Sequence, residues 1–359
     1  MKNKSVVVYI CAFALGLVSM IVVLAGPVQA EDGPSLFVEF PVPGQPLDVA
    51  VEGPGKVWFT LPAQNAVGRL WVTSTTEYQV VTYTIPTANS EPSYLVYTDG
   101  IIWFTESAGN KIGRLEPGTG NIAEFSVPTS GSYPTGIDAR NSGSQTHVWF
   151  TERDGNKLAR LVFTSTENYT VTEYSLPSQF SNGQPQDLYI QNLDSIWFTA
   201  PGVNRIGNLK PSRWPSSNAF VLVYTGGGSR PWSIKVDSDG FPWFTDVISN
   251  RIGQFFPQTT ANFKWYTLPF PNSAPYDLAI SSGAIWFTER DGNRVGQLNP
   301  NTGAIREFGL PAGSAPKGLA VDSSGCVWIA ENGRGRIGRW CPPYFRFVYL
   351  PLVLRNFGQ

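Results

Sequence analysis

The sequence predicts an all-β fold, a seven-bladed β-propeller of four-stranded blades. Two observations carry this prediction: a tryptophan recurs seven times at spacings of 42 to 48 residues, and a turn signal follows each tryptophan at a constant distance. Repeats of this length are typical of propeller blades or helical arrays. Composition favours the propeller, because only 15% of the residues are charged while 36 are Gly, 29 are Pro and 13% are aromatic. Such a chain consists of short strands and tight turns.

Each tryptophan marks a strand–turn–strand unit of fixed length. Seven residues after it stands an asparagine, or Gly335 in the last copy, and ten residues after it stands a glycine, or Ala159 in the third copy. Asn and Gly tolerate the left-handed backbone conformation that tight turns require. The constant distance therefore predicts one hairpin per blade. The tryptophans are Trp58, Trp103, Trp149, Trp197, Trp243, Trp286 and Trp328.

The sixth copy contains the four strands of a complete blade. We expect these strands at residues 275–280, 284–289, 293–298 and 305–310. Trp286 and Phe287 are adjacent, so their side chains point to opposite faces of the sheet. Both faces must then be buried, as they are where blades stack around an axis.

The two ends of the repeat are incomplete in a complementary way. The last copy has strands at residues 316–321, 326–331 and 336–340 but lacks a fourth. Leu36–Phe40, followed by Pro41, supplies a spare one. We predict that this N-terminal strand completes the seventh blade and closes the ring, which removes an open edge that would invite aggregation. The propeller then spans residues 31–341.

Residues 1–30 are predicted to be a signal peptide. Lys2 and Lys4 precede an apolar run, and Val28-Gln29-Ala30 offers the small residues that signal peptidase needs. An uncleaved membrane anchor is the alternative, because the apolar run approaches the length of a membrane span. We therefore expect a protein that is secreted or held at the cell surface. The apolar tail, residues 342–359, is either a processing or surface-retention signal or a segment that packs on the propeller rim.

The charge and the cysteine content indicate which partners to expect and whether the cysteines are oxidised. Without Lys2 and Lys4, 24 of the 26 basic residues remain against 27 acidic ones, and no basic stripe suggests nucleic acid. Cys326 and Cys341 are the cysteines of the mature chain, and in an exported protein they suggest one disulfide. If the turn between the two strands is centred between Gly333 and Arg334, the two cysteines face each other across neighbouring strands.

The second copy carries the motifs of a known family. It reads Trp103-Phe-Thr-Glu106, then Asn110-Lys-Ile-Gly-Arg114, Pro117-Gly-Thr-Gly120 and Glu124-Phe125. These motifs resemble the streptogramin B lyases, the virginiamycin B lyase family, and the resemblance covers roughly residues 36–340. It implies a seven-bladed propeller. It says less about the reaction, because the repeated residues are those that build blades.

The resemblance also implies where catalytic residues would lie: two histidines, each directly after the Pro that opens an inner strand of the last two blades, and glutamates that help hold Mg²⁺. In this chain Tyr276 and Lys317 stand at the histidine positions. Ala315 replaces one glutamate, and only Glu331 matches another. The sole histidine, His147, lies on the second strand of the third blade. We therefore predict that the lyase machinery is missing, and we expect no cofactor unless Mg²⁺ serves a divergent lyase.

A carboxylate follows the tryptophan by three residues in five copies. A ring of acids near the axis would suit a metal ion. A feature repeated in most blades is more often structural, so we favour hydrogen bonds from the following turn or ion pairs with the base eight residues after the tryptophan, such as Lys111 or Arg294. The acids are Glu106, Glu152, Asp246, Glu289 and Glu331.

Residues that break the repeat are the better candidates for a binding site. The second residue of the innermost strand varies most, and it reads Leu47, Ser93, Thr135, Gln186, Trp232, Tyr276 and Lys317. Strand direction places it at the same propeller mouth as the turns with the Glu-Arg-Asp sequences. We predict a ligand-binding mouth there, with a solvated funnel as the alternative. Its residues would be Trp232, Tyr276, Lys317, Arg153, Arg290, Glu289 and Glu331.

Two functions therefore remain open from the sequence. The first is a non-catalytic exported propeller, expected to be a monomer, that binds a small molecule, a glycan or a protein at its mouth. The second is a divergent metal-assisted lyase or hydrolase with Lys317 or Tyr276 as the base and Glu331 on the metal.

Overall fold

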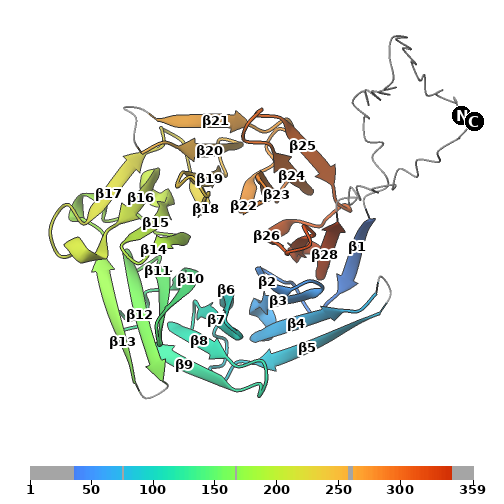
Figure 1. The fold of residues 1–359 in the computed structure, drawn as a ribbon, viewed down its shortest axis with the longest axis horizontal. Helices are drawn as coiled ribbons and strands as arrows, with labels where there is room; N and C mark the ends of the chain where they lie inside the picture. The colour runs from blue at the N-terminus through green and yellow to red at the C-terminus, as the bar shows by residue number, and fades with distance from the viewer. Residues whose placement is uncertain (1–35, 75–76, 166–167, 258–261, 342–359) are drawn as a thin grey trace, which may run out of the picture.

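The computed structural model describes residues 36–74, 77–165, 168–257 and 262–341. Seven four-stranded antiparallel sheets stand in a ring around a central axis (Figure 1). The predicted seven-bladed propeller is confirmed. The predicted signal peptide and the apolar tail lie outside the described residues. Within the described ranges, no helix is long and apolar enough to cross a membrane.

Each blade contributes one strand to each of four concentric layers. The innermost strands are β2 Val49–Gly53, β6 Pro92–Thr98, β10 Pro134–Ser142, β14 Leu188–Asn192, β18 Pro231–Val236, β22 Pro275–Ser281 and β26 Pro316–Val321. The second strands are β3 Lys56–Leu61, β7 Ile101–Glu106, β11 Gln145–Glu152, β15 Ser195–Ala200, β19 Pro242–Asp246, β23 Ala284–Glu289 and β27 Val327–Glu331. The third strands are β4 Ala66–Val72, β8 Lys111–Leu115, β12 Lys157–Ser165, β16 Arg205–Leu209, β20 Arg251–Phe255, β24 Arg294–Leu298 and β28 Arg336–Cys341.

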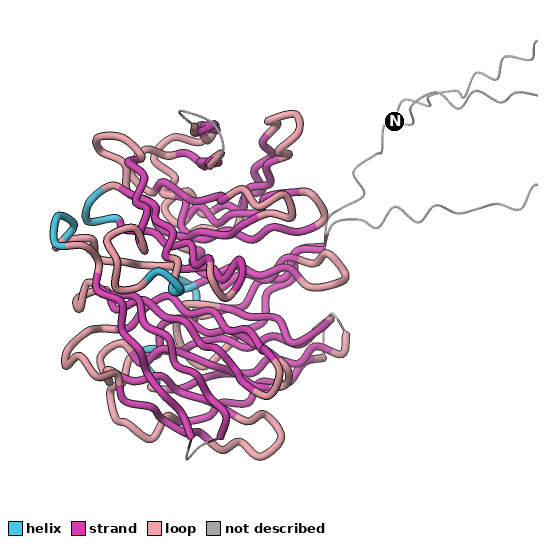
Figure 2. Tube along the Cα trace, turned by 60° about the vertical axis from the view of Figure 1, so that its left-hand side comes forward, coloured by secondary structure: helices cyan, strands magenta, loops and turns pink. Residues whose placement is uncertain are grey.

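The outermost strands complete the blades. They are β5 Tyr78–Thr84, β9 Ile122–Ser126, β13 Asn168–Ser175, β17 Phe220–Tyr224, β21 Phe263–Thr267, β25 Ile305–Gly309 and β1 Leu36–Pro41. Short 3₁₀ turns, cyan in Figure 2, connect some of the strands. They are η1 Pro62–Gln64, η2 Ser178–Phe180, η3 Pro201–Val203, η4 Pro211–Arg213 and η5 Asn332–Arg334.

The N-terminal strand closes the ring, as predicted. β1 pairs antiparallel with β28, from Leu36 opposite Cys341 to Pro41 opposite Arg336, so the first strand of the chain is the outer strand of the last blade. Figure 1 shows blue β1 beside red β28. Phe40 anchors the strand, because it is 1% exposed and its ring stacks 6.1 Å from that of Trp328.

The tryptophan, phenylalanine and glycine of the repeat pack the two faces of each blade. Trp103 and Phe104 are both fully or almost fully buried. The Phe104 ring lies over Gly113 so closely that a Cβ atom on that glycine would lie 2.0 Å from it. The same contact occurs between Phe287 and Gly296. The glycine ten residues after the tryptophan therefore makes room for a ring on the neighbouring strand.

The repeated asparagine joins each blade to the next segment of the chain. Asn110 has a φ of 54°, the left-handed conformation expected for the turn. Its side-chain amide also donates to the carbonyls of Val127 and Thr129 at 3.1 and 2.9 Å, and its oxygen accepts from the backbone N–H of Ser132 at 2.8 Å. The asparagine therefore stabilises the turn through its backbone conformation and the connection to the next blade through its side chain.

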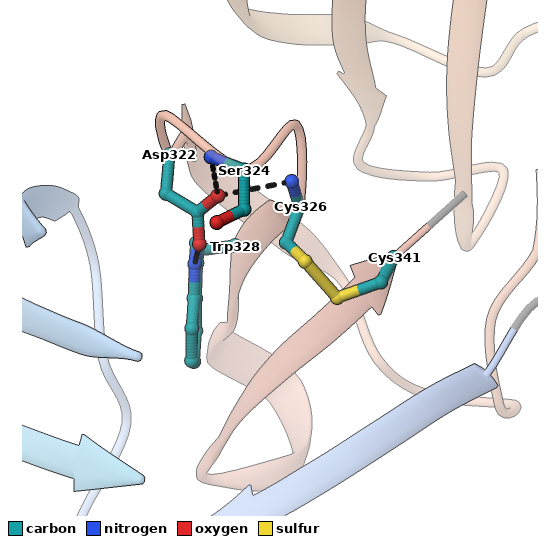
Figure 3. The surroundings of a disulfide bond; sticks show 5 residues. All are labelled: Asp322, Ser324, Cys326, Trp328 and Cys341. Atoms are coloured by element: carbon teal, nitrogen blue, oxygen red, sulfur yellow. Dashed lines mark hydrogen bonds between the residues drawn. A yellow bond between two sulfur atoms is a disulfide. The ribbon is translucent and has the colours of Figure 1, made fainter. Parts of the chain in front are cut away.

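A disulfide joins Cys326 and Cys341 across the last blade (Figure 3). Val327 pairs with Trp340, so the register continues to these cysteines as predicted, and their Cα atoms are 4.2 Å apart. Asp322 stabilises the turn that leads into β27. Its carboxylate accepts from the backbone N–H of Cys326 at 3.1 Å and from the Trp328 indole N–H at 2.9 Å.

We predict that removal of the disulfide lowers the free energy of unfolding. The two cysteines are 15 residues apart, and a loop of this size corresponds to about 3 kcal/mol of lost chain entropy in the unfolded state. The double variant Cys326→Ala/Cys341→Ala should show this loss in urea unfolding. A reductant should weaken the original chain but leave the variant unchanged. Free thiols in the oxidised protein would contradict the prediction.

We also predict that removal of Leu36–Pro41 exposes the edge of β28 and causes aggregation, since Phe40 loses its buried position and the ring opens. Size-exclusion chromatography with light scattering should then show large assemblies. A variant with the same six positions changed to Gly and Ser controls for chain length and should aggregate similarly. A deletion variant that stays monomeric and equally stable would contradict this role of β1.

Candidate functional site

The mouth of the propeller is the end of the axis that carries the second residue of each innermost strand. Trp232, Tyr276 and Lys317 occupy this position on β18, β22 and β26, three neighbouring strands around the axis (Figure 1). Each of these strands has a bulge at this position. In β22, for example, Pro275 pairs with Glu289 and Leu278 pairs with Phe287. An extra residue in one strand turns its side chain away from the regular pleat, which is how bulges serve binding sites.

The threonine of the Trp-Phe-Thr repeat holds the backbone of the mouth residues. Its hydroxyl donates to the carbonyl of the mouth residue one blade ahead: Thr199 to Trp232 at 2.8 Å, Thr245 to Tyr276 at 3.0 Å, and Thr288 to Lys317 at 2.7 Å. The same hydroxyl accepts a backbone N–H within its own blade. These threonines are fully buried, so the bonds are shielded from water.

Aromatic rings and cations meet on the fifth and sixth blades. The rings of Trp232 and Tyr276 lie 5.5 Å apart. The Arg230 guanidinium lies 5.5 Å from the Trp232 ring, and that of Arg290 lies 5.8 Å from the Tyr276 ring. Both distances are within the range of cation–π attraction.

Lys317 adds a second positive group beside Arg290. It is partly buried, and burial together with the charge of Arg290 lowers the pKa of its ammonium. Arg290 itself is held by Asp291, whose two carboxylate oxygens accept at 2.7 and 3.0 Å. The structure therefore brings together four of the predicted mouth residues: Trp232, Tyr276, Arg290 and Lys317.

Arg153 forms a separate group on the third blade. Its guanidinium lies 3.9 Å from the Tyr133 ring and is bound by Asp154 at 2.8 Å. The Tyr133 hydroxyl donates to Glu91 at 2.9 Å. The partners of Arg153 therefore come from the third blade and from the segment that connects it to the second blade.

Glu289 and Glu331, the remaining predicted mouth residues, have no exposed surface. Side chains alternate along a strand, and Glu289 lies on the same face of β23 as the buried Phe287. Both carboxylates therefore lie inside the blades, beneath the turns that carry Arg290 and Arg334. Sequence spacing had placed them at the right end of the strand but did not reveal how deeply they are buried.

The repeated acids make different contacts from blade to blade. Asp246 pairs with Arg251, the base eight residues after Trp243, at 3.0 Å, in agreement with the structural interpretation. In the second and third blades, Lys111 and Lys157 instead pair with acids of the outermost strands, Glu124 at 2.8 Å and Glu173 at 2.5 Å. Among the described residues, no group of three or more His, Cys, Asp or Glu side chains is arranged to hold a metal ion.

Mg²⁺ does not fit the side chains at the position that the family resemblance implies. Magnesium prefers oxygen ligands in octahedral geometry. Ala315 supplies a methyl group, Lys317 a cation, and Glu331 is buried with one oxygen accepting the Ser314 hydroxyl at 2.7 Å. No step through Mg²⁺ is therefore derived for this site.

Tyr94, which the sequence analysis did not single out, contacts two residues at the mouth position, Gln186 and Tyr276. The Gln186 amide donates to the Tyr94 hydroxyl at 3.1 Å, and this hydroxyl also interacts with that of Tyr276. Burial raises the pKa of both phenols, so both are neutral at physiological pH. The position directly after the mouth residue also varies among the seven copies, and this variation would have drawn attention to Tyr94. The residues there are Asp48, Tyr94, Gly136, Asp187, Ser233, Asp277 and Gly318.

Four buried glutamates have raised pKa values. Burial, followed by the neighbouring charges of Glu124 and Glu173, raises the pKa of Glu106 and of Glu152 to about 8. Burial likewise raises the pKa of Glu289 and of Glu331 to about 7. Neither oxygen of Glu106 has a hydrogen-bond partner of good geometry, because the nearby Ser90 hydroxyl donates to Asn65.

Comparison with known proteins identifies the family. The model described as the virginiamycin B lyase family matches residues 31–217 and 216–343. The chain belongs to the virginiamycin B lyase family. A comparison with curated proteins finds no match.

Solved structures of virginiamycin B lyases are similar over almost the whole propeller. A streptogramin B lyase structure has 26% identity and a TM-score of 0.75, covering 86% of this chain and 97% of that one. Virginiamycin B lyase from Staphylococcus aureus has 27% identity and a TM-score of 0.74, covering 85% and 99%. A catalytically inactive histidine-to-alanine variant of the Staphylococcus aureus enzyme, crystallised with Quinupristin, has 26% identity and a TM-score of 0.73, covering 85% and 99%.

We predict that this member of the virginiamycin B lyase family loses stability as the pH rises from about 5 to 8. Glu106 and Glu152 bind protons more tightly when folded than at their ordinary pKa of 4.5. Their stabilising contribution is therefore complete below that value and lost as the pH passes through about 8, at about 1.4 kcal/mol per pH unit for each group. Urea unfolding at several pH values measures the slope.

Glu106→Gln should flatten this slope, because the amide cannot ionise, while Glu77→Gln at an exposed position should not. On the acidic side, burial tends to raise the pKa of Glu124, but hydrogen bonds from Lys111 and Thr87 outweigh it and lower the pKa. Its contribution is lost as the pH falls below about 4.5. Maximum stability is therefore expected in mildly acidic solution. Stability that rises steadily from pH 5 to 8 would contradict this assignment.

Proposed function

We propose that this propeller is an exported, non-catalytic protein that binds a small anionic molecule at its mouth. One observation carries the proposal: the positions of the family histidines hold Tyr276, packed against Trp232, and Lys317, beside Arg290. Aromatic faces and positive charge replace the proton-accepting groups. Export rests on the N-terminal segment, residues 1–30.

The chemistry of these side chains supports loss of the lyase reaction. Elimination needs a base that accepts a proton at neutral pH, a task that suits neutral imidazole. Burial raises the pKa of Tyr276, so its phenol keeps its proton. In the Staphylococcus aureus relative, a single histidine-to-alanine change gives a catalytically inactive protein.

The ligand class follows from the groups that converge at the mouth. The Trp232 and Tyr276 rings offer apolar surface, and Arg230, Arg290 and Lys317 surround them with positive charge. A flat or ring-shaped molecule with a carboxylate or similar anion would use both features. A neutral glycan or a protein partner would use the rings but gain less from the cations.

A divergent lyase or hydrolase is the second candidate, because burial and Arg290 lower the pKa of Lys317. A lysine with a lowered pKa serves as a general base in some enzymes. This candidate also needs Glu331 to bind a metal, although its side chain is buried and already accepts from Ser314.

Calorimetric titration with aromatic carboxylates, their neutral amides, neutral oligosaccharides and peptides tests the binding proposal. We expect the carboxylates to bind more tightly than their amides, and Lys317→Gln and Arg290→Gln each to weaken binding roughly tenfold, as for loss of a charged hydrogen bond. Arg213→Gln, at an exposed position on η4, is the control and should bind normally. Equal affinity for carboxylate and amide would contradict the proposal.

We predict that the protein does not open the ring of a streptogramin B antibiotic. Incubation of the purified protein with such an antibiotic and Mg²⁺, followed by mass spectrometry, measures the reaction. The Staphylococcus aureus lyase serves as the positive control. Ring opening that depends on the protein and disappears in Lys317→Ala would establish the divergent lyase instead.

A further inference from the structure

A cavity of about 890 Å³ opens at the end of the axis opposite the mouth. In β22 the mouth residue Tyr276 is the second residue, whereas Leu278, Ile280 and Ser281 line the cavity further along the same strand. Five residues of strand separate Tyr276 from Ser281, a distance of about 16 Å. The residues that line the cavity include none of the mouth residues Trp232, Tyr276, Arg290 and Lys317, so the cavity is a separate site.

The cavity is lined about equally by polar and by apolar surface, and its apolar part includes aromatic rings. Val49, Leu95, Leu278 and Leu319 come from the innermost strands of four blades and are all buried. Tyr97, Tyr189 and Phe241 add aromatic rings from the second, fourth and fifth blades. A volume of this size and a lining of this composition suit a small organic molecule.

Lys235 supplies the only positive charge among the residues that line the cavity. Its ammonium nitrogen lies 3.2 Å from Asp187, and the charges of Asp277 and Asp138, next to Asp187, raise its pKa. Asp48 interacts with the same lysine, so four carboxyl groups act on one ammonium, although none of the four aspartates itself lines the cavity. Asp237 and Asp239, at the rim of the cavity, are also acidic.

The four aspartates are fixed by backbone N–H groups of the following strands. Asp48 accepts from Leu95 at 3.0 Å, and Asp138 accepts from Ile190 at 2.8 Å. Asp277 accepts from Leu319 at 2.8 Å. Burial raises the pKa of Asp138 to about 6 and also raises those of Asp48 and Asp277, and the charge of a neighbouring aspartate adds to each increase. The guanidinium of Arg140, another base of the same strand as Asp138, is exposed and donates to the Gln191 carbonyl at 2.9 Å.

We propose that the cavity binds an organic ammonium ion with an apolar body. The apolar body would pack on the strand walls, and the cationic group would lie against the aromatic rings in the negative field of the aspartates. Aromatic rings and carboxylates together favour quaternary ammonium groups over small hard cations. The described residues offer no three-ligand group for a metal ion, and the aspartate oxygens named above already accept N–H groups.

Three probes of one length test the charge preference: hexyltrimethylammonium, hexanol and hexanoate. Calorimetric titration should show saturable one-to-one binding of the ammonium probe, at least about tenfold tighter than hexanol, with hexanoate the weakest. Higher salt should weaken the ammonium probe more than hexanol. Equal affinity for all three, tighter binding of hexanoate, or no binding of the ammonium probe would each overturn the proposal.

Two variants and one control place the probe in the cavity. Ser281→Trp narrows the rim and should abolish binding, and Asp138→Asn should weaken the ammonium probe several-fold without affecting hexanol. An unchanged thermal unfolding midpoint shows that each variant is folded. Trp232→Ala, at the opposite mouth, should leave the affinity for the ammonium probe unchanged, although it removes a ring that can hold a cation there. Loss of binding in Trp232→Ala would move the site to the mouth and overturn the proposal.

Discussion

The hydroxyl of a buried threonine is the interaction on which much of the ring depends. Inner strands of neighbouring blades are not paired in a common sheet, so backbone groups at their first residues need other partners. The threonine supplies them by accepting an N–H within its blade and donating to a carbonyl one blade ahead, as Thr60 does to Ser93 and Thr288 does to Lys317. In the seventh copy Ala330 replaces the threonine, and Gly318 instead donates its backbone N–H to Leu47 of the first blade.

This bond also explains how the mouth can change its chemistry without changing the fold. The threonine binds the carbonyl of the mouth residue and leaves its side chain free. A tryptophan, a tyrosine and a lysine therefore occupy equivalent positions at Trp232, Tyr276 and Lys317 with the same backbone support. Solved structures of virginiamycin B lyases share this propeller fold.

The two ends of the propeller axis differ in their charged groups. Positive and aromatic groups lie at the mouth, whereas the cavity at the other end contains Lys235, on which four aspartates act. The two proposed sites therefore differ in the charge of the groups that surround them.

The sequence by itself determined the number of blades, the closure by β1 and the cysteine pairing. These features follow from local periods: the distance from Trp286 to Gly296 fixes a hairpin, and a turn at Gly333 fixes the register of Cys326 and Cys341. Only the tertiary structure decided which side chains meet around the axis. Asp48, Asp187 and Asp277 are separated by two or more blades' worth of sequence, and no local pattern shows that they converge on Lys235. The burial of Glu289 could not be predicted from the sequence either. It depends on the blade that packs against β23, and the sequence of a strand does not show which side chains of the neighbouring blade cover it.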